Sequence, residues 1–271
     1  MLNKLLKYEF KATARWFLPL YIALIVLTLL NKLTMIVELP EIAVFTVLEV
    51  LLMVFYVMII IFTSIATLIL LLVRFYKNLY TDEGYLTHTL PVKPSMHLNC
   101  KLLSGFIWNV ASGVVQIISL FILFAGEGLF TELAEVFGEA GEYLKSAGLF
   151  DNAIFTLIIF VVIMIMSVFY NLLMMYCSLS LGSLLRQYKI LGAILAYFVI
   201  NFVIQILGTI VAVIGMNTPI VYEILMVEDF TAEIFNLMNI FMGVSGVLTL
   251  ICSAIFYFLS HFAMSKKLNL D

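Results

Sequence analysis

Six long stretches of this sequence carry almost no charged side chains, and each is long enough to cross a lipid bilayer. The stretches are residues 17–37, 50–73, 102–126, 153–181, 190–214 and 237–264. A spanning helix needs about 20 mostly apolar residues, because about 30 Å of hydrocarbon is covered at about 1.5 Å per residue. The sequence therefore predicts an all-α integral membrane protein, with residues 1–271 as a single transmembrane domain.

Composition excludes the soluble alternatives. Apolar residues make up 64% of the chain and charged residues 11%, whereas soluble domains carry about 45–50% and about 25%. Disordered, collagen-like and disulfide-stapled chains are excluded as well. The three cysteines are widely separated and lie at no metal-ligand spacing from a histidine, so we expect small buried side chains and no metal site.

The basic side chains predict which side of the membrane each connection occupies. Cationic loops resist translocation, so the side richer in Lys and Arg is the cytoplasm. Twelve of the 14 basic residues lie before the first span, between spans 2 and 3, between spans 4 and 5, or after span 6, and only Lys32 and Lys145 lie on the other side. Both termini are therefore expected in the cytoplasm.

Residues 1–16 are predicted to form an amphipathic helix at the membrane interface. At about 100° per residue, the cations share one narrow stripe opposite Leu, Phe and Trp side chains. The stripe consists of Lys4, Lys7, Lys11 and Arg15. The alternative is an ordinary basic flank of the first span. Glu9 lies amid the apolar face and needs a cationic partner, for which Arg74 and Lys77 are the candidates.

Residues 74–101 form the longest cytoplasmic connection, and its breakpoints predict a compact structure. We expect Gly84 to end the extension of the second span and a short helix to follow over residues 85–90. Pro91 forces the preceding residue out of the helical region, and Pro94 suits the first turn of the third span. Such a helix–turn unit is suited to docking into a groove on a cytoplasmic partner.

This connection resembles the first cytoplasmic loop of ABC transporter permeases of the type-2 exporter class. The matching motifs are Asp82-Glu83-Gly84-Tyr85-Leu86, Thr89-Leu90-Pro91-Val92 and Lys101. The opening LLKYEFKATARWFLPLY is also similar to the start of a bacterial branch of these permeases. The resemblance covers residues 2–17 and 74–101 by motif and the remainder only by topology. Tyr85 departs from the Thr that many members carry at this position.

The resemblance implies an interfacial N-terminal helix, six spans, and a coupling helix between spans 2 and 3 that contacts an ABC ATPase. By this resemblance the coupling residues are Asp82, Glu83, Gly84, Tyr85, Leu86, Leu90 and Pro91. The chain itself has no GxxxxGK[ST] motif, which is the device that cradles nucleotide phosphates. ATP and magnesium are therefore expected on the partner ATPase, with no cofactor bound by this chain.

The two outer connections, residues 127–152 and 215–236, are acidic and too short to fold a sizeable extracellular domain. Four glycines in the first are expected to interrupt any long helix. They are Gly128, Gly138, Gly141 and Gly148. The acids are expected to form a solvated cap that opposes aggregation or, alternatively, to attract cationic peptides.

Neutral polar side chains form rows within three spans. The candidate residues are Asn109, Ser112, Gln116, Asn171, Asn201 and Gln205. Polar groups facing lipid are costly, so each row is expected to face protein or a cavity. Adhesion between helices and a substrate path at a dimer seam are the two interpretations.

The resemblance implies a permease subunit of an ATP-driven ABC exporter in the bacterial cytoplasmic membrane. It would pair with a second permease subunit, identical or homologous, and move an amphipathic, lipid-like or peptide substrate by alternating access. A nucleic-acid partner is not expected. The alternatives are a non-transporting membrane sensor or immunity protein that binds a peptide or membrane partner, and an intramembrane enzyme. The spans contain no Asp or Glu, so no catalysis is expected.

Overall fold

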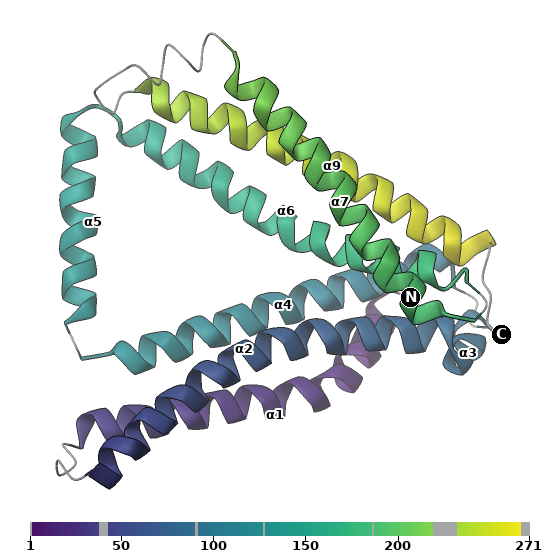
Figure 1. The fold of residues 1–271 in the computed structure, drawn as a ribbon, viewed down its shortest axis with the longest axis horizontal. Helices are drawn as coiled ribbons and strands as arrows, with labels where there is room; N and C mark the ends of the chain where they lie inside the picture. The colour runs from purple at the N-terminus through teal and green to yellow at the C-terminus, as the bar shows by residue number, and fades with distance from the viewer. Residues whose placement is uncertain are drawn as a thin grey trace. The chain divides into compact units, whose positions relative to one another are not determined.

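The structure, a computed structural model, describes residues 2–37, 43–89, 92–126, 128–185, 187–218 and 232–266. Among these residues, six helices are long and apolar enough to cross a membrane (Figure 1). They are α1 (Leu2–Ile36), α2 (Ala43–Tyr80), α4 (Pro94–Phe124), α6 (Phe150–Gly182), α7 (Lys189–Met216) and α9 (Ala232–Lys266). The six helices confirm the expected all-helical, multi-pass architecture. The side of the membrane on which each terminus lies remains a prediction.

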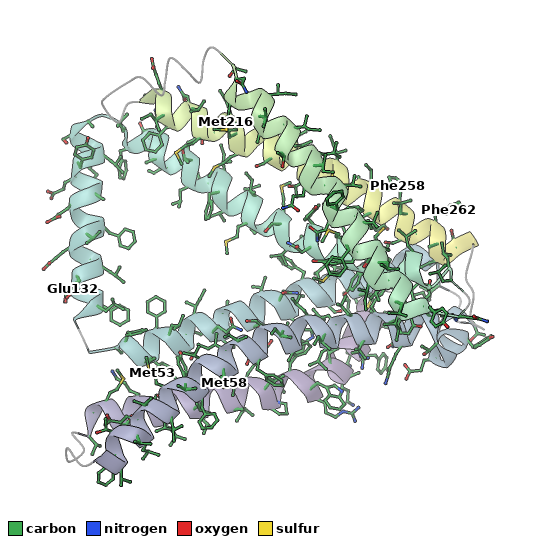
Figure 2. The ribbon with its side chains drawn as sticks, viewed as in Figure 1. Met53, Met58, Glu132, Met216, Phe258 and Phe262 are labelled. Atoms are coloured by element: carbon green, nitrogen blue, oxygen red, sulfur yellow. The ribbon has the colours of Figure 1, made fainter. Side chains whose placement is uncertain are left out.

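The outward surfaces of the six long helices are apolar. On α9, for example, Phe258 is 70% exposed and Phe262 is 47% exposed, and both side chains project from the helix in Figure 2. A water-soluble protein rarely exposes apolar patches of this extent, because they drive aggregation. Hydrocarbon is the solvent that suits such surfaces.

Within the expected transmembrane domain, the contacts form two compact units. Unit 1 consists of Met1–Lys77 and Leu90–Ala134, and unit 2 consists of Asn78–Thr89 and Glu135–Asp271. Unit 1 therefore holds α1, most of α2 and α4, whereas unit 2 holds α6, α7 and α9.

The three helices of unit 1 run up, down and up. Glu9 near the start of α1 contacts Lys101 near the start of α4, and Lys32 near the end of α1 donates a 2.9 Å hydrogen bond to the Leu123 carbonyl near the end of α4. These two helices are therefore parallel. Helix α2 is antiparallel to α1, because the late residue Asn31 donates to the carbonyl of the early α2 residue Leu52 at 3.1 Å. This is the order that three successive membrane crossings produce.

Trp108 of α4 is central to the packing between α1 and α4. Its ring stacks on Phe17 with 4.4 Å between centroids, and its Nε1 donates a 2.8 Å hydrogen bond to the Thr13 hydroxyl. The Tyr21 hydroxyl donates to the Trp108 carbonyl at 3.3 Å. Apolar contact and hydrogen bonding thus join the same faces, and the indole N–H is satisfied without water.

The N-terminal segment is the first part of α1 and not a separate helix. Helix α1 continues from Leu2 to Ile36 and passes through Pro19, so the expected boundary between residues 1–16 and 17–37 is not a helix break. Proline has no N–H to donate to the carbonyl of Arg15, four residues earlier. Packing of the buried face on α4 supports the helix through this position.

The acidic connection after α4 contains an 18-residue helix, α5 (Leu129–Ser146), so the expectation that its glycines prevent a long helix is wrong. Gly138 and Gly141 lie inside α5, where each glycine costs only about 1 kcal/mol relative to alanine. Gly128 and Gly148, which flank the helix, have φ values of +77° and +68°. The carbonyls of Leu144 and Lys145 accept hydrogen bonds from the N–H groups of Leu149 and Gly148, which is a Schellman motif.

In unit 2, α6 packs against both α7 and α9. Its last residue, Gly182, lies against Ala193 in the second turn of α7, where a Cβ on Gly182 would overlap the backbone of Ala193. At the other helix pair, a Cβ on Gly246 of α9 would lie 3.6 Å from Ile163. The Gly182 contact is the tighter one and has no side chain that could rotate away.

We expect Gly182→Ala to destabilise the protein by about 1–3 kcal/mol, because the added methyl group must displace backbone. Gly208→Ala is the matched control, since Gly208 lies in α7 with no atom within 4 Å of the added Cβ. The thermal midpoint of the monodisperse protein in detergent measures both effects. Equal midpoints for the two variants would contradict this packing of α6 on α7.

Candidate functional site

The connection between the second and third long helices contains a short helix, α3 (Asp82–Thr89), with bounds that differ from the expected 85–90. Helix α2 extends to Tyr80, and the helical path breaks at Thr81. The expected start of the short helix is therefore wrong by three residues. Leu90 and Pro91, two of the predicted coupling residues, lie outside the described residues.

Gly84 lies inside α3 and does not end the extension of α2, as the sequence had suggested. Its N–H donates a 2.7 Å hydrogen bond to the Thr81 carbonyl, which closes the first turn of α3. Gly84 is buried, whereas Glu83 and Tyr85 on either side are exposed. Asp82 and Leu86 belong to the same helix. A glycine ends a helix when it takes a positive φ, and Gly84 does not do so.

Pro94 begins α4, as predicted. Lys93 before it has an extended backbone, with φ −65° and ψ 142°, and occupies the N-cap position. Proline is well tolerated at the first helical position, where its missing N–H would have no helical partner in any case.

Glu9 of α1 binds two cations, Arg74 of α2 and Lys101 of α4. Lys101 Nζ lies 2.8 Å from Oε2 of Glu9, and Arg74 Nε lies 3.0 Å from Oε1. A longer bond of 3.4 Å joins Arg74 Nη2 to Oε2. The Glu9 and Lys101 side chains are 9% exposed, and that of Arg74 is 24% exposed. The predicted Glu9–Arg74 pair is confirmed, whereas Lys101 is a partner that the sequence did not identify.

The ion triad of Glu9, Arg74 and Lys101 joins the helices on both sides of α3. Arg74 lies near the end of α2, and Lys101 lies near the start of α4. Charge-assisted hydrogen bonds are stronger than neutral ones, and a buried charge that loses its partner is costly. The single carboxylate of α1 therefore holds α2 and α4 in fixed register where the connection containing α3 leaves and rejoins unit 1.

The four basic residues of the N-terminal segment lie on the exposed side of α1. Lys4, Lys7, Lys11 and Arg15 are all exposed. The opposite side is buried, with Glu9 at 9%, Thr13 at 1% and Phe17 at 1% exposure. The cationic stripe is exposed as predicted, and Phe17 on the predicted apolar face is buried, whereas Trp16 on that face is 56% exposed. The buried side chains pack on protein through Trp108 and Lys101.

The polar row of α4 makes contacts mainly with α2. Ser112 is buried and accepts a 3.2 Å hydrogen bond from Thr67, and Gln116 donates a 2.9 Å bond to Ser64. Asn109 instead donates to the Gly105 carbonyl of its own helix at 3.3 Å. For Ser112 and Gln116, the contacts favour adhesion between helices.

The candidate polar residues of α6 and α7, namely Asn171, Asn201 and Gln205, make no side-chain hydrogen bond to another helix in the part of the chain that the structure describes. Asn171 is exposed and donates to the Ser167 carbonyl of its own helix at 2.8 Å. Asn201 and Gln205 of α7 line a surface hollow of about 620 Å³ together with Tyr197 and Phe198. This hollow combines amide and aromatic groups on a helix that is expected to cross the membrane.

Ser119 is the centre of a second buried polar cluster in unit 1. Its Oγ lies 2.7 Å from the Thr28 hydroxyl of α1 and 2.8 Å from the Tyr56 hydroxyl of α2. All three side chains are at most 2% exposed. The spacing of polar residues along α4 places Ser119 on the same helix face as Ser112 and Gln116. Its partners on two other helices depend on tertiary packing, which the sequence of α4 does not indicate.

The described residues contain no group of three or more His, Cys, Asp or Glu side chains that could hold a metal ion. The three cysteines are free thiols, with Cys100 and Cys177 buried and Cys252 half-buried. The chemistry visible in the described part of the chain is therefore that of ion pairing and neutral hydrogen bonding.

Comparison with family models, curated proteins and solved structures finds no match to this chain.

We expect Glu9→Gln to lower the free energy of unfolding by about 3 kcal/mol, because Lys101 would remain as a buried charge beside the half-buried like charge of Arg74. Glu135→Gln, at an exposed position of α5, is the control and should change little. Denaturant titration of the protein in detergent gives both values. Adding Lys101→Met to Glu9→Gln should recover part of the loss, and simple additivity of the two single losses would contradict the ion triad.

We expect Ser119→Ala to destabilise the protein by about 1 kcal/mol, since it removes a hydroxyl shared by two buried partners. Ser245→Ala is the matched control, because Ser245 is exposed and bonds only to the Met242 carbonyl of its own helix. The same denaturant titration compares the two variants. A loss no greater than that of the control would show that the cluster contributes nothing to helix association.

Proposed function

We propose that this chain is the membrane-spanning permease subunit of an ATP-driven ABC exporter. The observation that carries the proposal is α3, an eight-residue helix between α2 and α4 that contains the Asp82-Glu83-Gly84 motif. That motif resembles the coupling helix of type-2 exporter permeases. The connection containing α3 also lies on the membrane side to which the basic residues assign the cytoplasm.

The exposed side chains of α3 suit contact with a cytoplasmic ABC ATPase. Glu83 and Tyr85 are exposed, and Tyr85 is 52% exposed. In the proposed assembly the ATPase binds ATP and magnesium, and its movement displaces α3. Because α3 is covalently linked to α2 and α4, the displacement reaches both helices.

The ion triad gives this proposed movement a route into α1. Glu9 is bound to Arg74 and Lys101, which lie on the two helices that flank α3. A displacement that moves α2 and α4 together therefore carries α1 with them, unless two buried charge contacts are broken. Alternating access requires helices to move together as a group, and the ion triad links α1, α2 and α4 in this way.

The proposed assembly contains a second permease subunit, identical or homologous, and lies in the bacterial cytoplasmic membrane. Its substrate is an amphipathic molecule, lipid-like or peptide. The hollow on α7 supports this class, because the amides of Asn201 and Gln205 lie beside the rings of Tyr197 and Phe202. Such a surface can contact apolar groups and satisfy a few polar ones.

We expect Tyr85→Asp to reduce binding of the partner ATPase roughly tenfold or more, as loss of an aromatic contact at an interface does. The experiment first looks for a Walker-type ATPase in the neighbouring reading frames, then copurifies the tagged chain with it and measures the bound fraction and ATP hydrolysis. Tyr188→Asp is the matched control, since Tyr188 is 65% exposed and lies just before α7 on the same expected membrane side.

Equal binding and hydrolysis for the natural chain and Tyr85→Asp would overturn the role of α3. If the natural chain copurifies with no ATPase, the permease proposal fails. A membrane sensor or immunity protein that acts without ATP is then the better account.

A further inference from the structure

Helix α5 is strongly amphipathic, with apolar and acidic side chains on separate faces. At about 100° per residue, the apolar side chains span an arc of about 140°. This apolar arc consists of Leu129, Phe130, Leu133, Val136, Phe137, Ala140, Tyr143 and Leu144. The acids form a stripe on the other side at spacings of three and four, namely Glu132, Glu135, Glu139 and Glu142. Figure 2 shows Glu132 and other acidic side chains on one side of α5 and aromatic rings on the opposite side.

The apolar arc of α5 is left largely exposed by the residues that the structure describes. No residue of α5 is buried. Phe137 is 72% exposed, Val136 is 61% exposed and Tyr143 is 57% exposed. An isolated helix of this length is only marginally stable in water, and like charges three and four residues apart weaken it further. The α5 helix therefore needs an apolar environment that covers its apolar arc and stabilises it.

Both ends of α5 are tied to helices that are long and apolar enough to span the membrane. Helix α4 ends at Phe124 and α5 begins at Leu129, and α5 ends at Ser146 whereas α6 begins at Phe150. Since α4 and α6 are successive spans, these two ends emerge on the same side of the bilayer. A link of four residues reaches at most about 14 Å, so neither end of α5 can lie far from the membrane surface.

A ring contact shows which surface the apolar arc continues. Phe130, on the arc, stacks on Phe121 of α4 with 5.3 Å between centroids and 8° between ring planes. Phe121 lies in the last turn of α4 and is 50% exposed, on a helix whose exposed apolar surface faces lipid in a spanning protein. The apolar arc of α5 and the lipid-facing surface of α4 are therefore continuous at this point.

We propose that α5 lies in the interface between the bilayer and water, on the side opposite α3. The apolar arc enters the lipid beneath the headgroups, and the stripe of four glutamates faces water. The partner of this surface is the lipid bilayer itself, which covers the rings of Phe130 and Phe137. This inference requires that the chain spans the membrane but does not depend on ABC transport.

The test measures which solvent surrounds each face of α5 in the full-length protein. The three native cysteines are replaced by alanine, a single cysteine is introduced at Phe137 or at Glu135, and each is spin-labelled. These positions lie about 160° apart around the helix. The labelled proteins are placed in phosphatidylcholine nanodiscs, and collision rates with oxygen and with a water-soluble nickel chelate are compared. The ratio of oxygen to nickel collisions is expected to be several-fold higher at position 137 than at position 135.

Three results of this experiment overturn the proposal. Equally low ratios at the two positions would place the whole of α5 in water, and equally high ratios would place the glutamate stripe in lipid. Exclusion of both reagents at position 137 would show that protein, from this chain or from a second subunit, covers the arc.

A second measurement avoids dependence on the cysteine-free background. Phe137→Trp and Glu135→Trp are made in the natural chain, and quenching of tryptophan fluorescence by phosphatidylcholine with brominated acyl chains is measured relative to the natural protein. Stronger quenching for Phe137→Trp supports insertion of the arc. Equal quenching for the two variants contradicts it.

Discussion

The Glu9 carboxylate is the charge on which the register of unit 1 depends. An ionised acid on the buried face of a helix is tolerable only where cations are brought to it. The cations come from the end of α2 and the start of α4, so all three helices must align at this level. Along α1, the contacts of Thr13, Thr28 and Lys32 with α4 follow in the same order. The polar contacts thus select one register from the many that apolar packing alone would permit.

Much of this fold could be predicted from local sequence, because solvent and backbone constraints act locally. The six spans follow from runs of apolar residues, and Pro94 begins α4 because proline lacks an N–H. The expectations for the glycines are wrong, since Gly84 and Gly138 need no positive φ and helices continue through them. Lys101 as a partner of Glu9, and Tyr56 as a partner of Ser119, depend on which helix faces meet. No spacing within one helix contains that information.

The polar rows show why burial alone does not distinguish adhesion from a pathway. The hydroxyl groups of Ser112 and Ser119 form hydrogen bonds with neighbouring helices. They therefore stabilise unit 1 and have few free positions with which to bind a ligand. Asn201 and Gln205 differ, because they line an open hollow on α7. Amides on a surface expected at membrane depth need partners from lipid, from a substrate or from another subunit. The proposed second subunit and the proposed amphipathic substrate could both supply such partners. The Ser119 cluster needs none, because its hydroxyl groups already bond to one another.

The two helices outside the spans differ in the surface that they leave uncovered, and this difference decides which partner each can have. On α3, Gly84 is buried while Glu83 and Tyr85 are exposed, so a partner meets a charge and a ring with a polar tip, as a protein surface can. On α5, the exposed arc is apolar along almost its whole length, and the Tyr143 hydroxyl is its single polar side-chain group. A protein partner for such an arc would need a matching groove of the same length. The bilayer, to which both ends of α5 are already tied, provides an apolar surface without that requirement.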